Sequence, residues 1–297
     1  LKTVAMESET RTEERTIDPL RDEDAADLIK ALFADAYERR LERGALLCRY
    51  GDVARHMWLL THGEVDVIVP GLPVQTVVGR PDRPCLLGEL GYFTGLRRAA
   101  TLAASTPVRL LELPYERVAA REQKEPAFAA WLDRFYRVRI LVPVLSRHEV
   151  FKRMNEVDRK KLVALFERVE ARPGQILFSE GEEHPYAYFV QRGTLLLLGR
   201  DARGRETLLG GAHAGDIVHL GGLLQGFRPK YHVMASTPCK LLRLAQARFT
   251  PFVEKRPWLV KAILRFSRQI RAGEALHPTG ANIWEADRYI ELKKPIG

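Results

Sequence analysis

Cysteine and long apolar runs are what this chain has least of. Its 297 residues include only 3 cysteines, scattered without the spacing of a metal site: Cys48, Cys85 and Cys239. Such usage argues against a disulfide scaffold and is typical of the reducing cytoplasm. No apolar stretch reaches the roughly 18 residues of a membrane span, and no charged leader precedes an apolar block. We therefore expect a cytoplasmic protein with no membrane partner.

The motifs of common enzyme chemistries are also missing. The sequence has no Gly-rich triphosphate loop, no histidine–carboxylate cluster of metal-ligand spacing and no nucleophile elbow. Hydrolysis of a phosphodiester would need a metal or a placed general base, and nothing in the sequence suggests either. We therefore predict a protein that is not an enzyme and that needs no metal.

Length and charge indicate the number of domains and the kind of partner. A chain of 297 residues with 46% hydrophobic content favours two domains, each with its own core. The formal net charge of +9 allows an anionic partner. No block of like charge stands out, however, so a mixed, solvated surface is favoured over a nucleic-acid-binding face.

Glycines at matched intervals indicate an internal duplication. Gly44, Gly51 and Gly63 recur 130 positions later as Gly174, Gly181 and Gly193. The segment 104–113 matches the segment 235–244, displaced by 131. A constant offset with one inserted residue predicts a duplicated domain. The expected division is a flexible leader over 1–18, domains over 19–142 and 143–273, and a C-terminal tail over 274–297.

Each copy is expected to be mainly β with flanking helices. Val65, Val67 and Val69 recur at the period of a strand with one buried face. Turn glycines separate many short strands of this kind, as in a small antiparallel sandwich or roll. The apolar run 194–198 in the second copy predicts a strand that is buried on both faces.

Helices are expected to bracket each barrel. A helix that opens near Pro126 carries Trp131 and Phe135 at helical spacing, and Pro143 is expected to end it at the domain junction. In the second copy, the apolar stripe of Leu259 and Ile263 indicates the corresponding helix. We expect these stripes to pack in the core.

The segment 87–101 is the strongest candidate for a binding site. Gly88 would let the backbone approach a ligand closely, and Glu89 would accept a hydrogen bond from a sugar hydroxyl. Arg98 would offer a planar fork of donors to a phosphate. A phosphate at the first turn of a helix also meets unpaired backbone amides. One loop would thus grip both ends of a ribose phosphate.

This segment closely resembles the phosphate-binding cassette of cyclic-nucleotide-binding domains, which occur in bacterial catabolite-activator-type regulators and in regulatory subunits of protein kinase A. The resemblance implies two tandem β-rolls of the double-stranded β-helix or jelly-roll type. It assigns the phosphate to Arg98 rather than to Arg97. It implies a ligand site formed by Gly88, Glu89, Leu90, Arg98, Ala99 and Ala100.

The resemblance also narrows the choice of nucleotide. A hydroxyl residue directly after the arginine often favours cyclic GMP in this family, and here that residue is Ala99, so cyclic AMP is expected as the ligand before cyclic GMP. A side chain that caps the base should come from the helix after the barrel, where Trp131, Phe135 and Tyr136 are candidates. Core packing competes with this role for Trp131 and Phe135.

The second cassette has lost these groups. His219 replaces Gly88, Leu220 replaces Glu89, and Pro229 stands where Arg98 is expected. Arg228 or Lys230 still offers positive charge, but without the carboxylate the selectivity for a cyclic nucleotide should be lost. We expect a degenerate copy that keeps its fold and a stoichiometry of one nucleotide per chain.

Three functional hypotheses follow. The first is a regulatory protein that binds cyclic AMP in its first domain and signals to an unidentified protein partner, with homodimers expected from the family's apolar trailing helices. The second is a DNA-binding regulator of the catabolite-activator type. Residues 274–297 are too short for the helix-turn-helix of such a regulator. Nucleic acid is therefore expected as a partner only if the chain is a fragment. The third is a ligand-free scaffold whose tail anchors through Trp284, Tyr289 and Ile290.

Overall fold

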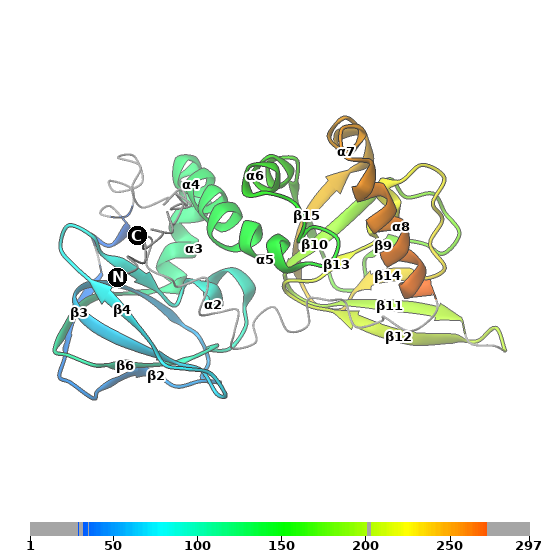
Figure 1. The fold of residues 1–297 in the computed structure, drawn as a ribbon. Coiled ribbons are helices and arrows are strands. Elements are labelled where there is room, and N and C mark those ends of the chain that lie inside the picture. The colour runs from blue at the N-terminus through cyan, green and yellow to red at the C-terminus, as the bar shows by residue number, and fades with distance from the viewer. Residues whose placement is uncertain (1–28, 30–31, 35, 201–202, 272–297) are drawn as a thin grey trace, which may run out of the picture.

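The computed structural model describes residues 29, 32–34, 36–200 and 203–271. The expected leader and tail, including Trp284, Tyr289 and Ile290, lie outside these residues. Two β-domains are joined by a series of helices that lies between them (Figure 1). Within the described ranges no helix is long and apolar enough to cross a membrane.

The first domain consists of two antiparallel sheets that share one long strand. Their strands are β1 (Tyr37–Leu41), β2 (Leu46–Cys48), β3 (His56–Ile68), β4 (Gln75–Gly79), β5 (Cys85–Leu87), β6 (Thr101–Ala104) and β7 (Val108–Pro114). The first half of β3 pairs with β5 and β7, and its second half pairs with β4 and β6. The register shifts between Leu60 and His62, where the strand passes from one sheet to the other.

The second domain repeats this pairing strand by strand. Its strands are β8 (Glu167–Ala171), β9 (Ile176–Phe178), β10 (Tyr186–Arg192), β11 (Leu195–Arg200), β12 (Glu206–Ala212), β13 (Ile217–Val218), β14 (His232–Ala235) and β15 (Cys239–Ala245). The sheet orders are β13-β10-β15-β8 and β12-β11-β14-β9. Since β10 and β11 correspond to the two halves of β3, the duplication and the tandem β-roll fold are confirmed.

One strand differs from its expected burial. The run 194–198 was expected to be buried on both faces, but in β11 the side chains alternate between buried and half-buried. Leu195 and Leu197 face the core, whereas Leu196 and Leu198 do not. The expectation was wrong because β11 has one face on the core of its roll, so the pleat turns every second leucine outward.

Each copy combines its barrel with helices, and those from α3 to α6 connect the two domains. The first copy has α2 (Glu89–Thr94), α3 (Tyr115–Lys124), α4 (Pro126–Tyr136), a π-helical turn η1 (Arg137–Leu141) and α5 (Val142–Arg147). The second copy has α6 (Glu156–Ala164), a 3-10 turn η2 (Leu220–Leu223), α7 (Gln246–Glu254) and α8 (Pro257–Arg271). In Figure 1, α3 to α6 occupy the space between the two barrels.

Pro143 does not end the helix that begins at Pro126. The chain stays helical to Arg147 through the π-turn, in which the amide of Val142 donates to the carbonyl of Arg137. Pro143 then falls within the first turn of α5, where a missing amide proton costs little. The expected stop was wrong because the wider π-turn places the proline at the start of α5, where the helix can continue.

The cores of the two domains are continuous through these helices. Phe128, Trp131, Phe135 and Tyr136 on α4 are buried in the same apolar cluster as Leu259, Ile263 and Phe266 on α8. A separate, smaller cluster fills the inside of the second roll around Val190 and Val233. The first roll and the connecting helices therefore pack as one unit against the end of the second roll.

Candidate ligand-binding site

A left-handed turn at Gly88 opens the candidate cassette. Strand β5 ends at Leu87, Gly88 has φ of 79°, and α2 begins at Glu89. A Cβ atom at Gly88 would lie 2.6 Å from Nη1 of Arg98 and 3.0 Å from Cζ3 of Trp58. Both the backbone angle and the lack of space therefore require glycine here. The neighbours that crowd Gly88 are atoms of the protein itself, so its close approach to a ligand stays a prediction.

Arg98 is folded inward onto the backbone of the cassette. Its Nη2 donates to the carbonyl of His56 at 2.7 Å, and its Nη1 lies 3.3 Å from both the carbonyl of Gly88 and the hydroxyl of Tyr115. The guanidinium carbon lies 4.3 Å from the centre of the Trp58 ring, a cation–π distance. The side chain is consequently 8% exposed. Arg98 is positioned by two strands, β3 and the end of β5.

Five of the six predicted site residues surround one small pocket. Its lining includes Gly88, Leu90, Arg98, Ala99 and Ala100, together with Cys48, Gly91, Arg97 and Leu102. Glu89 does not line it; this carboxylate is 2% exposed in the first turn of α2. The pocket has about 20 Å³, which holds roughly one water molecule. A nucleotide would enter only if α2 and the loop 95–98 moved apart.

Two residues that support Arg98 were missed in the sequence. Trp58 stacks on the guanidinium and donates through Nε1 to Glu112 at 2.6 Å. Tyr115 opens α3 and donates its hydroxyl to the carbonyl of Gly88. Burial raises the pKa of Tyr115 to about 12, partly offset by the charge of Arg98, so the phenol keeps its proton. A comparison of the two copies could have indicated both residues. The second copy, which has lost the ligand groups, has Tyr188 in place of Trp58 and Gln246 in place of Tyr115.

The candidate base-capping residues lie in the core. Trp131 packs between Phe128 and Phe135, with ring centres 5.8 and 5.5 Å away. Tyr136 is fully buried against Phe93. Neither ring lines the pocket at Arg98. Base capping by Trp131 or Tyr136 stays a prediction that requires α4 to move.

Backbone hydrogen bonds establish which residues of the two cassettes correspond. Gly51 donates to the carbonyl of Arg98 at 2.9 Å, and its counterpart Gly181 donates to the carbonyl of Pro229 at 2.8 Å. Arg97 donates to the carbonyl of Gly51, as Arg228 does to that of Gly181. Pro229 therefore occupies the position of Arg98. The structure confirms the residue-by-residue comparison of the two segments.

Aromatic side chains fill the second cassette. His219 adopts φ of 62° in place of Gly88 and is the one non-glycine residue with positive φ in the described part of the chain. Its ring packs on Phe178 at 4.3 Å, and its Nε2 donates to the carbonyl of His184 at 3.1 Å. Phe227 and Tyr231 close the remaining space, which is about 10 Å³. The frame of the site persists without its ligand groups.

Two buried histidines should make folding sensitive to acid. Burial lowers the pKa of His148 to about 4, and burial with the charge of His184 lowers that of His219 to about 4. Both are neutral in the folded chain, whereas an unfolded histidine binds a proton near pH 6.5. The unfolding free energy should therefore fall as the pH drops from 6.5 towards 4, by roughly 3 kcal/mol per histidine.

Chemical denaturation at several pH values measures this loss. Between pH 6.5 and 4, the unfolding free energy should change less steeply with pH for His148→Leu than for the unaltered protein, whatever the stability of the variant at pH 7. His62 is exposed, and His62→Gln should leave the slope unchanged. Equal slopes for His148→Leu and His62→Gln would show that burial does not hold His148 neutral.

Comparisons with known proteins show which domain family the chain matches. The family model of the cyclic nucleotide-binding domain matches residues 38–123 and 168–256, more than half of the chain. A stretch of 75 residues is 36% identical to a cyclic nucleotide-gated potassium channel of Rhizobium etli, covering 25% of this chain and 20% of the channel. A stretch of 87 residues is 33% identical to another such channel, from Mesorhizobium japonicum, and covers 29% of this chain and 22% of that channel.

The curated relatives are much longer proteins, of whose length this chain spans about a fifth. Among solved structures, one that is similar to this chain is the regulatory domain of Toxoplasma gondii PKA with cAMP. The match covers 90% of this chain and 99% of that structure, with 20% identity and a TM-score of 0.39. Within the described ranges no group of three or more metal-ligating side chains occurs.

Proposed function

Since this chain belongs to the cyclic nucleotide-binding domain family, we propose that its first domain binds one cyclic AMP per chain and that the second binds none. The observation that carries the proposal is the difference between two cassettes with corresponding backbone hydrogen bonds. In the first, Gly88 and Arg98 line a pocket and Glu89 is buried beside it in the first turn of α2, whereas the second has His219, Leu220 and Pro229 at the corresponding positions.

Each residue of the first cassette has a role in this proposal. Arg98 exchanges its backbone acceptors for the phosphate oxygens, and the amides at the start of α2 add donors. Glu89 accepts from the free ribose hydroxyl. Ala99, half-buried at the pocket, offers no hydroxyl to a guanine amino group, which favours cyclic AMP over cyclic GMP.

The proposed output is a change in the helices behind the cassette. Phe93 on α2 packs against Phe135 and Tyr136 on α4, with ring centres 6.0 and 5.2 Å away. A movement of α2 on ligand binding would therefore displace α4 and the π-turn. Such a displacement is a shift between two arrangements of the domain junction. We propose that a protein partner in the cytoplasm reads it, without catalysis by this chain.

Titration calorimetry tests ligand and stoichiometry together. The full chain titrated with cyclic AMP should give a transition at one nucleotide per chain, and cyclic GMP should bind more weakly. A stoichiometry of two would contradict the loss of the second site. No heat and no thermal stabilisation with cyclic AMP, cyclic GMP or cyclic dinucleotides would contradict the nucleotide function and favour a ligand-free scaffold.

A further inference from the structure

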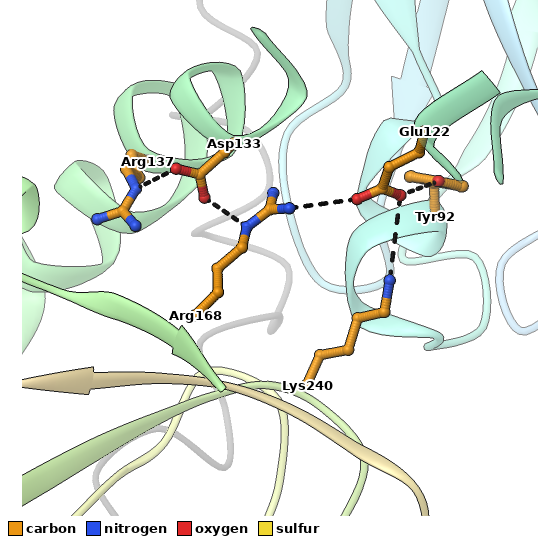
Figure 2. A network of polar contacts seen from close by, with 6 residues as sticks. All are labelled: Tyr92, Glu122, Asp133, Arg137, Arg168 and Lys240. Carbon is orange, nitrogen blue, oxygen red and sulfur yellow. Dashed lines mark hydrogen bonds and ion pairs between the residues drawn. The ribbon is translucent and has the colours of Figure 1, made fainter. Parts of the chain in front are cut away.

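The second domain reaches back to the cassette helix through a chain of polar contacts (Figure 2). Tyr92 on α2 donates its hydroxyl to Oε2 of Glu122 on α3 at 2.6 Å. From the second domain, Nη1 of Arg168 on β8 lies 3.3 Å from Oε1 of Glu122. Lys240 on β15 approaches the same carboxylate at 4.0 Å. Glu122 thus connects the cassette helix of the first domain with two strands of the second.

Arg168 extends this connection to the helices of the domain junction. Its Nε donates to Asp133 on α4 at 2.7 Å, and the other oxygen of Asp133 accepts from Arg137 at 2.7 Å. Arg137 lies in the π-turn and also donates to the carbonyl of Val163 on α6. One guanidinium of the second domain therefore holds α3 and α4 together, and α3 in turn holds Tyr92.

A second contact lies at the other end of α2. Gly95 caps this helix with φ of 71°, and a Cβ atom there would lie 2.8 Å from Nε of Arg192 on β10. Arg192 thus packs directly on the cap, and no ion-pair partner of Arg192 occurs within the described ranges. Between the two contacts lies an interdomain pocket of about 150 Å³, lined by Tyr92, Glu122, Arg168, Arg192 and Lys240 among others. The helix is held at Tyr92 and at Gly95.

These contacts are specific to the first cassette. The residue that corresponds to Tyr92 in the second copy is Leu223, which is buried in the core. Tyr92 lies one turn after Glu89 on α2, so any movement of that helix displaces both side chains. The polar connection therefore starts at the helix whose movement the pocket at Arg98 requires.

From these contacts we propose that the degenerate second domain acts as a clamp on the cassette of the first, through Glu122 and Arg168, and that it lowers the affinity for the nucleotide. This inference rests on the proposed function of the first domain. The clamp holds α2 in the arrangement whose pocket has about 20 Å³. Binding then requires the clamped arrangement to open, which reduces the apparent affinity by the fraction of open molecules.

Arg168→Ala is the direct test, with Arg243→Ala as the matched control. Arg243 lies on the adjacent strand β15 with similar side-chain exposure, 32% against 37%, and its ion pair with Glu167 stays within the second domain. Calorimetric titration should give a dissociation constant for cyclic AMP about fivefold lower for Arg168→Ala. Tyr92→Phe, which removes only the hydroxyl, should change it in the same direction. Arg243→Ala should leave it unchanged.

Hydrogen exchange without nucleotide separates the clamp from the nucleotide function. The amides of residues 92–95 should exchange faster in Arg168→Ala than in Arg243→Ala. Equal exchange would overturn the clamp, and so would an unchanged or weaker affinity in Arg168→Ala. If neither variant nor the unaltered chain binds any cyclic nucleotide, the proposed function fails, and exchange alone decides whether the second domain restrains α2.

Discussion

Arg98→Ala is expected to weaken cyclic AMP binding by about 100-fold or more, while Arg97→Ala changes it little. A guanidinium donates two charge-assisted hydrogen bonds to a phosphate, and each contributes about 1.5–3 kcal/mol. Trp58 and the backbone of β3 hold the guanidinium of Arg98 beside the pocket, where its backbone acceptors would be exchanged for phosphate oxygens. Arg97 is exposed and bonds to the carbonyl of Gly51. It is therefore a matched control of equal charge and adjacent position.

Titration calorimetry with both variants measures the difference, and circular dichroism establishes that each is folded. Arg98→Lys sharpens the result, because lysine keeps the charge but loses the planar fork. Its affinity should fall between those of Arg98→Ala and the unaltered chain. Equal losses for Arg97→Ala and Arg98→Ala would mean that the phosphate responds only to the positive charge of the loop.

The duplication explains why so much of the fold was predictable from one sequence. Turn glycines such as Gly63 and Gly193 adopt positive φ in both copies, so their spacing indicates where the strands end. The cassette was predictable because its groups lie within a short segment. The two copies also served as controls for each other, since Pro229 occupies the backbone position of Arg98.

The contacts that were not predicted join residues far apart in sequence. Trp58 and Arg98 meet only because β3 crosses beside the cassette, and Arg168 meets Glu122 only because the domains pack through the helices between them. Sequence periodicity contains no information on such pairs. The continuation of the helix past Pro143 has a different cause, a local π-turn that tolerates a proline.

Gly88→Ala is expected to lower the free energy of unfolding by about 2–3 kcal/mol, and Gly51→Ala by about 1–2 kcal/mol. Both glycines have positive φ, of 79° and 81°, so both variants carry the cost of a left-handed alanine. A Cβ atom at Gly51 meets nothing within 4 Å, whereas at Gly88 it meets Arg98, Trp58 and the carbonyl of His56. The difference between the two variants measures this crowding. Urea denaturation supplies both values.

Binding of cyclic AMP should fall about 100-fold in Gly88→Ala, because the side chain that yields most easily to the new Cβ is Arg98. This coupling is testable in a double-mutant cycle. Once Arg98 is alanine, the 2.6 Å contact with Nη1 no longer exists, so Gly88→Ala should cost less stability in the Arg98→Ala background than alone. Strictly additive losses would show that the crowding comes from Trp58 and the backbone of His56. In that case Gly88 would serve the turn itself and not the position of Arg98.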